Sequence, residues 1–146
     1  MHEVSGQRAS SRSSIITYWV TTGVLATECL VGGVMGALQL SPFIEVMRHL
    51  GYPIYLMTIH GVWYMLAGVA LLVPGFPRLK EWAYAGLFFS YTGAAASHLA
   101  VGDGFPSIVA PIIFTGFVVA SWALRPSDRT IRSLKKVTPR TERGLR

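Results

Sequence analysis

Charged residues are scarce in this chain of 146 residues. They make up 14% of the sequence, against about 25% in an average soluble domain. Hydrophobic residues reach 51%, and they lie in long runs rather than alternating with charged positions. The shortage of charge excludes an ordinary soluble globular domain, whose helices need a polar face toward water.

Cysteine is nearly absent as well. Because Cys29 is the single cysteine, the chain can form no internal disulfide and offers no thiol pair for redox exchange. We expect Cys29 to be a buried structural thiol, since it lies inside an apolar stretch. Hydrolase and nucleotide-binding motifs (GxSxG, the Walker loop, the Rossmann glycine pattern) are missing in any suitable context, so nothing supports those activities.

Four apolar stretches fill most of the chain, and each has about the 17–25 residues that a helix needs to cross a bilayer. They are Ile15–Leu40, Ile54–Val73, Trp82–Val101 and Ile108–Leu124. The sequence therefore predicts an all-α fold, an integral membrane four-helix bundle over residues 15–125. We expect residues 1–14 to form a disordered N-terminal tail, and residues 126–146 to form a basic cytoplasmic tail.

Positive charge gathers on one side of the predicted spans. Twelve of the thirteen Lys and Arg residues precede the first stretch, separate the second from the third, or follow the fourth, whereas Arg48 separates the first from the second. Cytoplasmic loops of membrane proteins carry an excess of Lys and Arg, so this bias predicts a multi-pass protein with both termini in the cytoplasm. The basic tail is expected to lie along anionic membrane lipids, and nucleic-acid binding is not expected.

The segment Ser41–Pro53, between the first two stretches, mixes apolar residues with Glu45, Arg48 and His49. This pattern is typical of a short helix that lies at a membrane interface. The sequence therefore predicts a short interfacial helix between the first and second spans.

Small residues form a face on two of the predicted spans. Gly32 and Gly36 are four residues apart on the first span, and Gly86 and Gly93 lie on one side of the third. Small residues let helix backbones approach closely in lipid. We therefore expect the first and third spans to pack against each other through these faces.

Polar side chains within the predicted spans are candidates for a functional site. The candidate catalytic residues are Glu28, His60 and His98, and the candidate ligand-binding residues are Gln39, Tyr64, Ser90 and Tyr91. At 1.5 Å of helix rise per residue, Gln39 and the two histidines form an outer layer. The remaining four form a second layer about 15 Å below the outer boundary.

Two hypotheses fit these layers equally well. The residues line a cavity that opens outward or sideways into the outer leaflet, or they form a hydrogen-bonded plug in which a protonated Glu28 donates to a neighbour. Because an ionisable residue at that depth costs about 2.5–3.5 kcal/mol or more, Glu28 needs a partner in either case. A metal centre of two histidines and one carboxylate has no support from local ligand spacing, and no metal is expected.

Four strings of the sequence carry a family resemblance. They are HLGYP at 49–53, PGFPRLKEWAYAG at 74–86, TGA at 92–94 and SHLAVGD at 97–103. Together with Glu28 and Gly32–Gly33, these strings resemble the DoxX-like family of small four-helix membrane proteins, over about Tyr18 to Pro126. The resemblance implies a location in the bacterial cytoplasmic (inner) membrane. Some relatives are linked to quinone-coupled sulfur oxidation or to redox homeostasis, so quinone is the cofactor that the resemblance implies, and no other cofactor is evident.

Three positions depart from the family pattern as the resemblance implies it. An acidic residue is common in place of Gly36, a lysine is common in place of Tyr64, and an apolar residue is usual in place of His60. Joint loss of an acid–lysine pair leaves no unpaired buried charge behind. The change fits a new pocket formed by His60 and Tyr64, and it equally fits a neutral plug.

Two functions from different classes follow as hypotheses. The first is an accessory or quinone-associated redox component that works with a redox partner subunit. The second is an intramembrane isomerase or cyclase for an apolar prenyl- or lipid-like substrate. In that enzyme Glu28 donates a proton, His60 or His98 removes one, and Tyr64 and Tyr91 orient the substrate. Solute transport has less support, because the chain shows no broken helix or inverted repeat; a homo-oligomer is compatible with every hypothesis.

Overall fold

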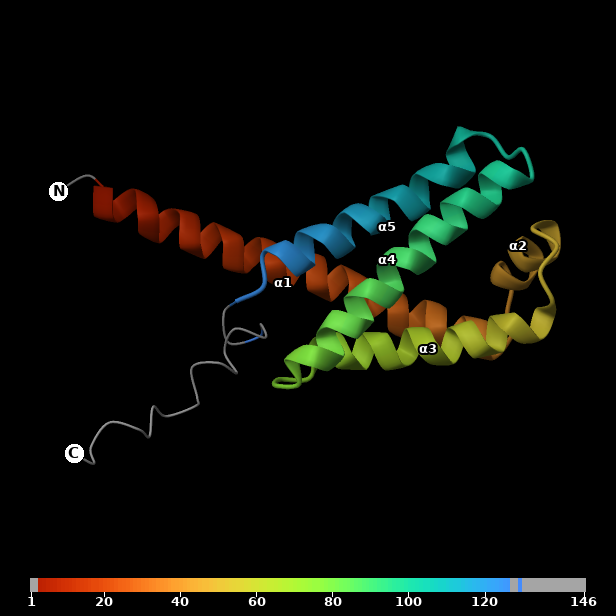
Figure 1. The fold of residues 1–146 in the computed structure, drawn as a ribbon, viewed down its shortest axis with the longest axis horizontal. Coiled ribbons are helices and arrows are strands. Elements are labelled where there is room, and N and C mark those ends of the chain that lie inside the picture. Colours follow the sequence, from red (N-terminus) through yellow and green to blue (C-terminus); the bar gives the residue numbers. More distant parts are fainter. Residues whose placement is uncertain (1–2, 127–128, 130–146) are drawn as a thin grey trace, which may run out of the picture.

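The computed structural model describes residues 3–126 and 129, and side chains from residue 12 onward. Its helices are α1 (Glu3–Ala37), α2 (Phe43–His49), α3 (Ile54–Leu72), α4 (Pro77–Ala100) and α5 (Phe105–Ala123), and the described residues contain no strand (Figure 1). The four long helices lie lengthwise against one another, and α2 has seven residues. The predictions of an all-α fold and of a short helix between the first two long ones are confirmed.

Proline marks the places where three of the helices begin. Pro53 precedes α3 in an extended conformation. Pro77 and Pro106 occupy the first turn of α4 and of α5, where the missing N–H of proline has no helical partner to lose. These residues explain why the chain breaks into separate helices despite its continuous apolar character.

Three helices are long and apolar enough to cross a membrane, namely Arg12–Ala37 of α1, Ile54–Leu72 of α3 and Phe105–Ala123 of α5. The chain is therefore a multi-pass membrane protein. The prediction of a fourth span at Trp82–Val101 is supported by length, since α4 has 24 residues, but not by composition. Lys80, near the start of α4, and the serines and histidine farther along make this helix more polar than α3 and α5.

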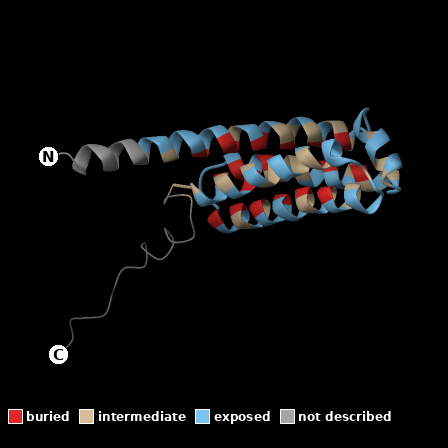
Figure 2. Cartoon of the chain, turned by 90° about the horizontal axis from the view of Figure 1, so that it is seen from above, coloured by how far each residue is buried: buried red, intermediate tan, exposed pale blue. Residues whose placement is uncertain are grey.

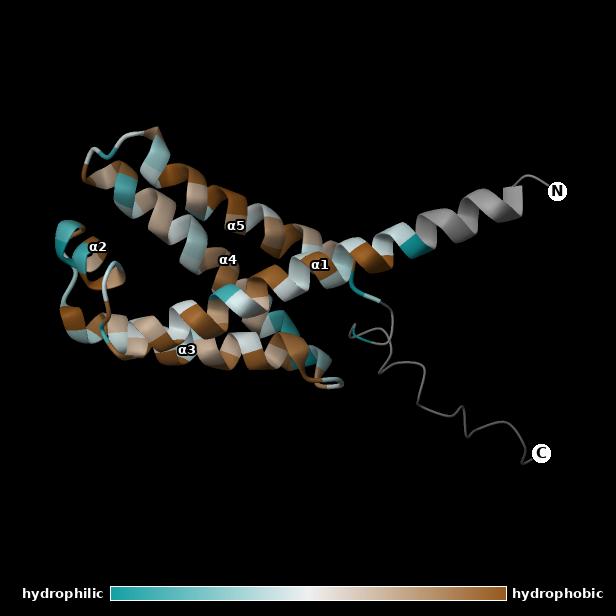
Figure 3. Ribbon diagram, turned by 180° about the vertical axis from the view of Figure 1, so that it is seen from behind, coloured by the Kyte–Doolittle hydropathy of each residue, from teal (hydrophilic) through white to brown (hydrophobic). Residues whose placement is uncertain are grey.

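Large apolar side chains cover the outside of the protein. Trp63, Trp82 and Phe89 are among the most exposed. Buried positions face the inside of the helix assembly (Figure 2), and hydrophobic residues occur along the whole length of the long helices (Figure 3). Such a surface would drive association in water, whereas in a bilayer it contacts lipid chains.

The first long helix begins earlier than the first apolar stretch. α1 begins at Glu3 and continues without a break to Ala37, over 35 residues, so it includes residues 3–14, which the sequence predicts as a disordered tail. No proline interrupts this segment, and extending an existing helix by one residue adds a hydrogen bond without a new nucleation cost. Apart from Pro126 and Arg129, the predicted basic tail at 126–146 lies outside the described residues.

α1 and α3 make the closest helix contact in the protein, at Gly33, Gly36 and Gly61. A Cβ atom added at Gly61 would lie 2.4 Å from the Ala37 nitrogen and 2.5 Å from the Gly33 carbonyl oxygen. One added at Gly33 would lie 2.8 Å from the Gly61 carbonyl oxygen. The two backbones thus touch directly, as the small-residue contacts of membrane helices allow.

This contact corrects the expected packing of small-residue faces. The glycines of α1 meet α3, whereas the sequence analysis paired them with the span that became α4. Gly86 and Gly93 of α4 have open space where a Cβ would lie. The sequence does not indicate this partner, because the small residues of α3 that meet α1, Gly61 and Gly68, are seven residues apart rather than at the four-residue spacing of Gly32 and Gly36.

The buried core lies toward the end of the protein where α3 turns into α4, which we call the inner end. Its centre contains Leu25 and Cys29 of α1, Leu71 of α3, Leu87 of α4 and Val118 of α5. Cys29 is fully buried, as expected. From the inner end, α3 and α4 diverge toward the outer end, where α2 lies between them (Figure 1).

Buried polar contacts tie the helices together near the inner end. Ser121 of α5 is within 2.7 Å of the Thr22 hydroxyl of α1 and within 2.8 Å of the Tyr84 hydroxyl of α4. Lys80 is 1% exposed, and its ammonium group donates to the carbonyl oxygens of Ala70 and Leu71. A cation at this position satisfies carbonyl groups that the last turn of α3 leaves free.

We expect Gly61→Ala to lower the free energy of unfolding by about 1–3 kcal/mol, because the new methyl group forces the two backbones apart. Reversible unfolding in mixed detergent micelles, followed by circular dichroism, measures this change. Gly86→Ala is the matched control, and its effect should stay within about 0.5 kcal/mol, since open space surrounds it. Equal effects of the two substitutions would contradict the close contact.

Candidate functional site

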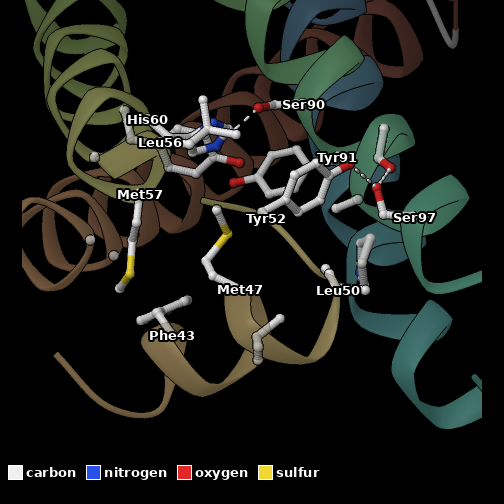
Figure 4. A pocket seen from close by; sticks show the side chains of 18 of the residues that line it. Phe43, Met47, Leu50, Tyr52, Leu56, Met57, His60, Ser90, Tyr91 and Ser97 are labelled. Carbon is white, nitrogen blue, oxygen red and sulfur yellow. Dashed lines mark hydrogen bonds between the residues drawn. The ribbon is translucent and has the colours of Figure 1, made fainter. Parts of the chain in front are cut away.

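A cavity of about 490 Å³ occupies the space between the diverging halves of α3 and α4. α1 and α5 also contribute to its wall, and α2 covers it at the outer end. Figure 4 shows that its lining includes Phe43, Met47 and Leu50 of α2, Leu56, Met57 and His60 of α3, and Ser90, Tyr91 and Ser97 of α4. Most of the lining is apolar, which is typical of sites for small organic ligands.

Glu28 and Tyr91 form the deepest polar pair on the cavity wall. The Tyr91 hydroxyl donates a hydrogen bond to Glu28 Oε2. The Tyr91 ring is held on two sides, edge-on against Tyr64 with a centroid distance of 5.8 Å and stacked on Phe114 at 5.3 Å. Helical rise predicts that Glu28, Tyr64 and Tyr91 lie at the same depth in the membrane. The structure brings these three residues together.

His60 and Ser90 form a second polar pair, between α3 and α4. Ser90 Oγ lies 3.1 Å from His60 Nε2, and the imidazole packs on the Tyr64 ring with a centroid distance of 4.4 Å. His60 and Tyr64 are one helical turn apart, which explains why their rings meet. Both residues line the cavity, so an imidazole and the Glu28 carboxyl face the same space.

Gln39 does not line the cavity with the other candidates. It follows the end of α1 in a left-handed conformation, with φ 54°, and its side-chain amide donates to Thr58 Oγ1 at 3.0 Å. The sequence analysis extended the first helix to Leu40, which would have kept Gln39 on the Glu28 face. Because α1 ends at Ala37, that extrapolation fails.

His98 lines the outer part of the cavity and takes part in a chain of contacts that the sequence analysis did not predict. Its Nδ1 lies 2.6 Å from Asp103 Oδ2, and His49 Nε2 lies 2.7 Å from Asp103 Oδ1. The Tyr52 hydroxyl lies 2.8 Å from Ser97 Oγ. The α2 segment is thus attached to the outer end of α4 at two points.

α2 acts as a cover rather than as part of the core. None of its residues is buried, and its side chains Phe43, Val46 and Met47 line the cavity. Phe43 reaches Gly32 of α1, where its ring would lie 3.8 Å from an added Cβ atom. The cover is therefore held by cavity-facing apolar contacts and by the hydrogen bonds of His49 and Tyr52.

Asp103 is the charged centre of this outer contact. The hydrogen bond from His98, and then that from His49, lower the pKa of the Asp103 carboxyl below its usual value. The carboxylate is therefore ionised at neutral pH and accepts hydrogen bonds from both rings. Polar residues inside the apolar stretches are the signal that predicts a site in this sequence, and neither Asp103 nor His49 lies inside one.

Among the residues that the structure describes, no three His, Cys, Asp or Glu side chains are arranged to hold a metal ion. Glu28 pairs with Tyr91, His60 with Ser90, and His98 with Asp103. The candidate acid and bases thus belong to separate hydrogen-bonded pairs along one wall.

A family model described as the DoxX-like family matches residues 20–121 of the chain. This match covers α2, α3 and α4, the second half of α1 and nearly all of α5, so the chain belongs to the DoxX-like family. No curated protein sequence and no solved structure matches the chain. The match confirms the family resemblance of the four sequence strings. It does not assign an activity, so the function has to be inferred from the cavity.

We expect a cysteine at position 90 to react with a small thiol reagent, because Ser90 faces the cavity. The rate at which the reagent modifies Ser90→Cys should exceed the rate for Ser121→Cys by at least about ten-fold. The reason is that exposure controls thiol reactivity and Ser121 is fully buried. Cys29 is buried in both variants, and wild-type protein gives the background rate. Mass spectrometry after timed exposure to N-ethylmaleimide measures the modification, and equal rates would show that the cavity is closed to small molecules.

Proposed function

We propose that this DoxX-like protein is a membrane-embedded accessory redox component that holds an apolar ring compound of the quinone class for a partner protein. The observation that carries the proposal is the cavity, whose apolar wall bears polar pairs at a few fixed points. A volume of about 490 Å³ falls within the range of about 300–1,000 Å³ that small-molecule sites occupy.

The residues of the cavity fit a quinone by their chemistry. A quinone supplies a reversible two-electron carrier whose polar atoms are oxygens on an apolar ring. Ser90 and His60 offer hydroxyl and imidazole groups toward such oxygens, and Tyr64 offers an aromatic face for the ring. The Glu28–Tyr91 pair gives the same wall a carboxyl group able to hold or release a proton.

The proposal includes four membrane spans, with both termini on the cytoplasmic side of a bacterial inner membrane. Three spans are given by composition, and the polar residues of α4 that lower its hydropathy include cavity-lining Ser90, Ser97 and His98. A helix whose polar side chains face a cavity can lie among apolar helices without exposing these groups to lipid. The charge bias of the loops supports the orientation.

Reporter fusions test this topology. A green fluorescent protein joined after Arg146 should fluoresce in bacterial cells, and alkaline phosphatase joined there should be inactive. Phosphatase joined after Gly51, in the turn that follows α2, should be active, because that turn is expected outside the cytoplasm. The opposite pattern would show that both termini lie outside the cytoplasm. The same location for both sites would show that the chain crosses the membrane one time fewer than proposed.

We expect protein purified in mild detergent to carry a quinone that lipid extraction, mass spectrometry and an absorption spectrum identify. Gly93→Leu should reduce its occupancy by at least about ten-fold, because a leucine there fills part of the cavity, and a factor of ten corresponds to about 1.4 kcal/mol. Gly93 lines the cavity and has open space around it, so the larger side chain meets no nearby atom at its Cβ.

Gly86→Leu is the matched control. Gly86 lies on the same helix, also has open space, and is outside the cavity lining. Its occupancy should equal that of wild-type protein. An empty wild-type protein would favour the polar plug over a binding site, and equal loss in both variants would point to a general effect on the fold.

A second candidate function, an intramembrane isomerase or cyclase, is favoured by one observation. Glu28 and His60 face the same cavity from different helices, as an acid and a base acting on one substrate require. In an isomerisation, Glu28 would give a proton to one carbon of an apolar prenyl-type substrate, and His60 would remove a proton from another. A bound prenyl-type molecule in place of quinone would support this function, and Glu28→Gln should then abolish turnover without releasing the ligand.

A further inference from the structure

Beside the outer end of the cavity, which His98 lines, one carboxylate lies between two imidazoles. Asp103 Oδ2 is 2.6 Å from His98 Nδ1, and Asp103 Oδ1 is 2.7 Å from His49 Nε2. The side chains of His98 and Asp103 are 14% and 16% exposed, whereas that of His49 is 56% exposed. Asp103 and His98 thus form a largely covered pair, and His49 approaches it from the α2 side.

The backbone turn that follows α4 fixes the position of Asp103 relative to His98. Gly102 has a φ of 80°, a conformation that glycine adopts without the steric cost of a Cβ atom. It turns the chain so that the Asp103 N–H donates to the His98 carbonyl oxygen at 2.9 Å. Asp103 therefore holds His98 through both its main chain and its side chain, and the position of the carboxylate is fixed relative to the ring.

An ionised carboxylate can only accept hydrogen bonds, so the His98 nitrogen that faces it must carry a proton. A neutral imidazole has one donor nitrogen and one acceptor nitrogen, and the partner of one decides the state of the other. With the proton on Nδ1, Nε2 of neutral His98 is an acceptor. His98 also lines the cavity, which makes this nitrogen the one available to a ligand.

We propose that Asp103 is a positioning residue that fixes His98 as the Nδ1–H tautomer, so that the outer end of the cavity accepts a hydrogen bond from a ligand hydroxyl. This inference rests on the proposed ligand-binding function and narrows it. The ligand class is an apolar molecule that bears a hydroxyl group, such as a phenol, a hydroquinone or a prenol. Among quinone-type compounds the site favours the reduced form, which has the donor that a carbonyl oxygen lacks.

Nitrogen-15 NMR of the His98 ring tests the tautomer without any ligand. The spectrum is recorded on full-length protein in micelles at mildly alkaline pH, and is assigned by comparison with His98→Gln. A protonated Nδ1 and an unprotonated Nε2 are expected. Asp103→Asn should shift the proton toward Nε2, because the asparagine amide can donate to Nδ1, whereas His49→Gln should leave the His98 tautomer unchanged. A proton on Nε2 in wild-type protein would overturn the proposal.

Two probes of nearly equal shape test the ligand class. The dissociation constant of para-hexylphenol should be roughly ten-fold lower than that of para-hexylanisole, which lacks the hydroxyl hydrogen. This preference should disappear in Asp103→Asn, while circular dichroism and elution volume stay the same. Equal binding of both probes to wild-type protein would exclude the hydroxyl site and leave the cavity as a binding site. Binding of neither probe would count against the proposed function, and the NMR result would still decide the role of Asp103.

Discussion

The direct backbone contact between α1 and α3 is the constraint on which the rest of the structure depends. Lipid chains give two helices no hydrophobic reason to associate, so close packing has to supply the attraction. Gly33, Gly36 and Gly61 supply it by leaving no side chain between the backbones. α1 and α3 consequently form one unit, and α4 and α5 join this unit mainly toward the inner end, through the core around Leu71 and the Ser121 hydrogen bonds.

This arrangement explains why a cavity forms in the outer half. A pair of helices fixed at close range cannot also follow α4 along its whole length, and α3 and α4 diverge from their shared turn (Figure 1). The space between them is bounded by polar pairs that bridge helices, Glu28 with Tyr91 and His60 with Ser90. The cavity and plug hypotheses are thus partly reconciled. The polar residues satisfy one another, as a plug would require, yet they do so along a wall and leave the volume between the helices open.

The sequence predicts the positions of the helices and the depths of their polar residues better than it predicts which helices touch and which turn contacts form. Helix positions follow from apolar length and from proline, so the α2 segment and the long helices were predictable. The meeting of Glu28, Tyr64 and Tyr91 was also predictable, because helical rise fixes depth. Which helix the α1 glycines contact was not predictable, since the glycines of α3 that face α1, Gly61 and Gly68, are too widely spaced to stand out as a small-residue motif. Asp103 was missed because its role depends on a turn that folds back onto His98, and nothing in the hydropathy of a loop residue reveals such a contact.

The outer end of the protein is held together in a different way from the rest, and this difference bears on function. α2 has no buried residue, so it can leave its place without exposing a packed core to lipid. The hydrogen bonds of His49 with Asp103 and of Tyr52 with Ser97 attach α2 and the turn after it to the end of α4 and the turn that follows, and water can replace such bonds at little net cost. Separation of α1 from α3, by contrast, would break a contact for which no substitute exists in lipid. Entry to the cavity is therefore easier past α2 than between the paired helices.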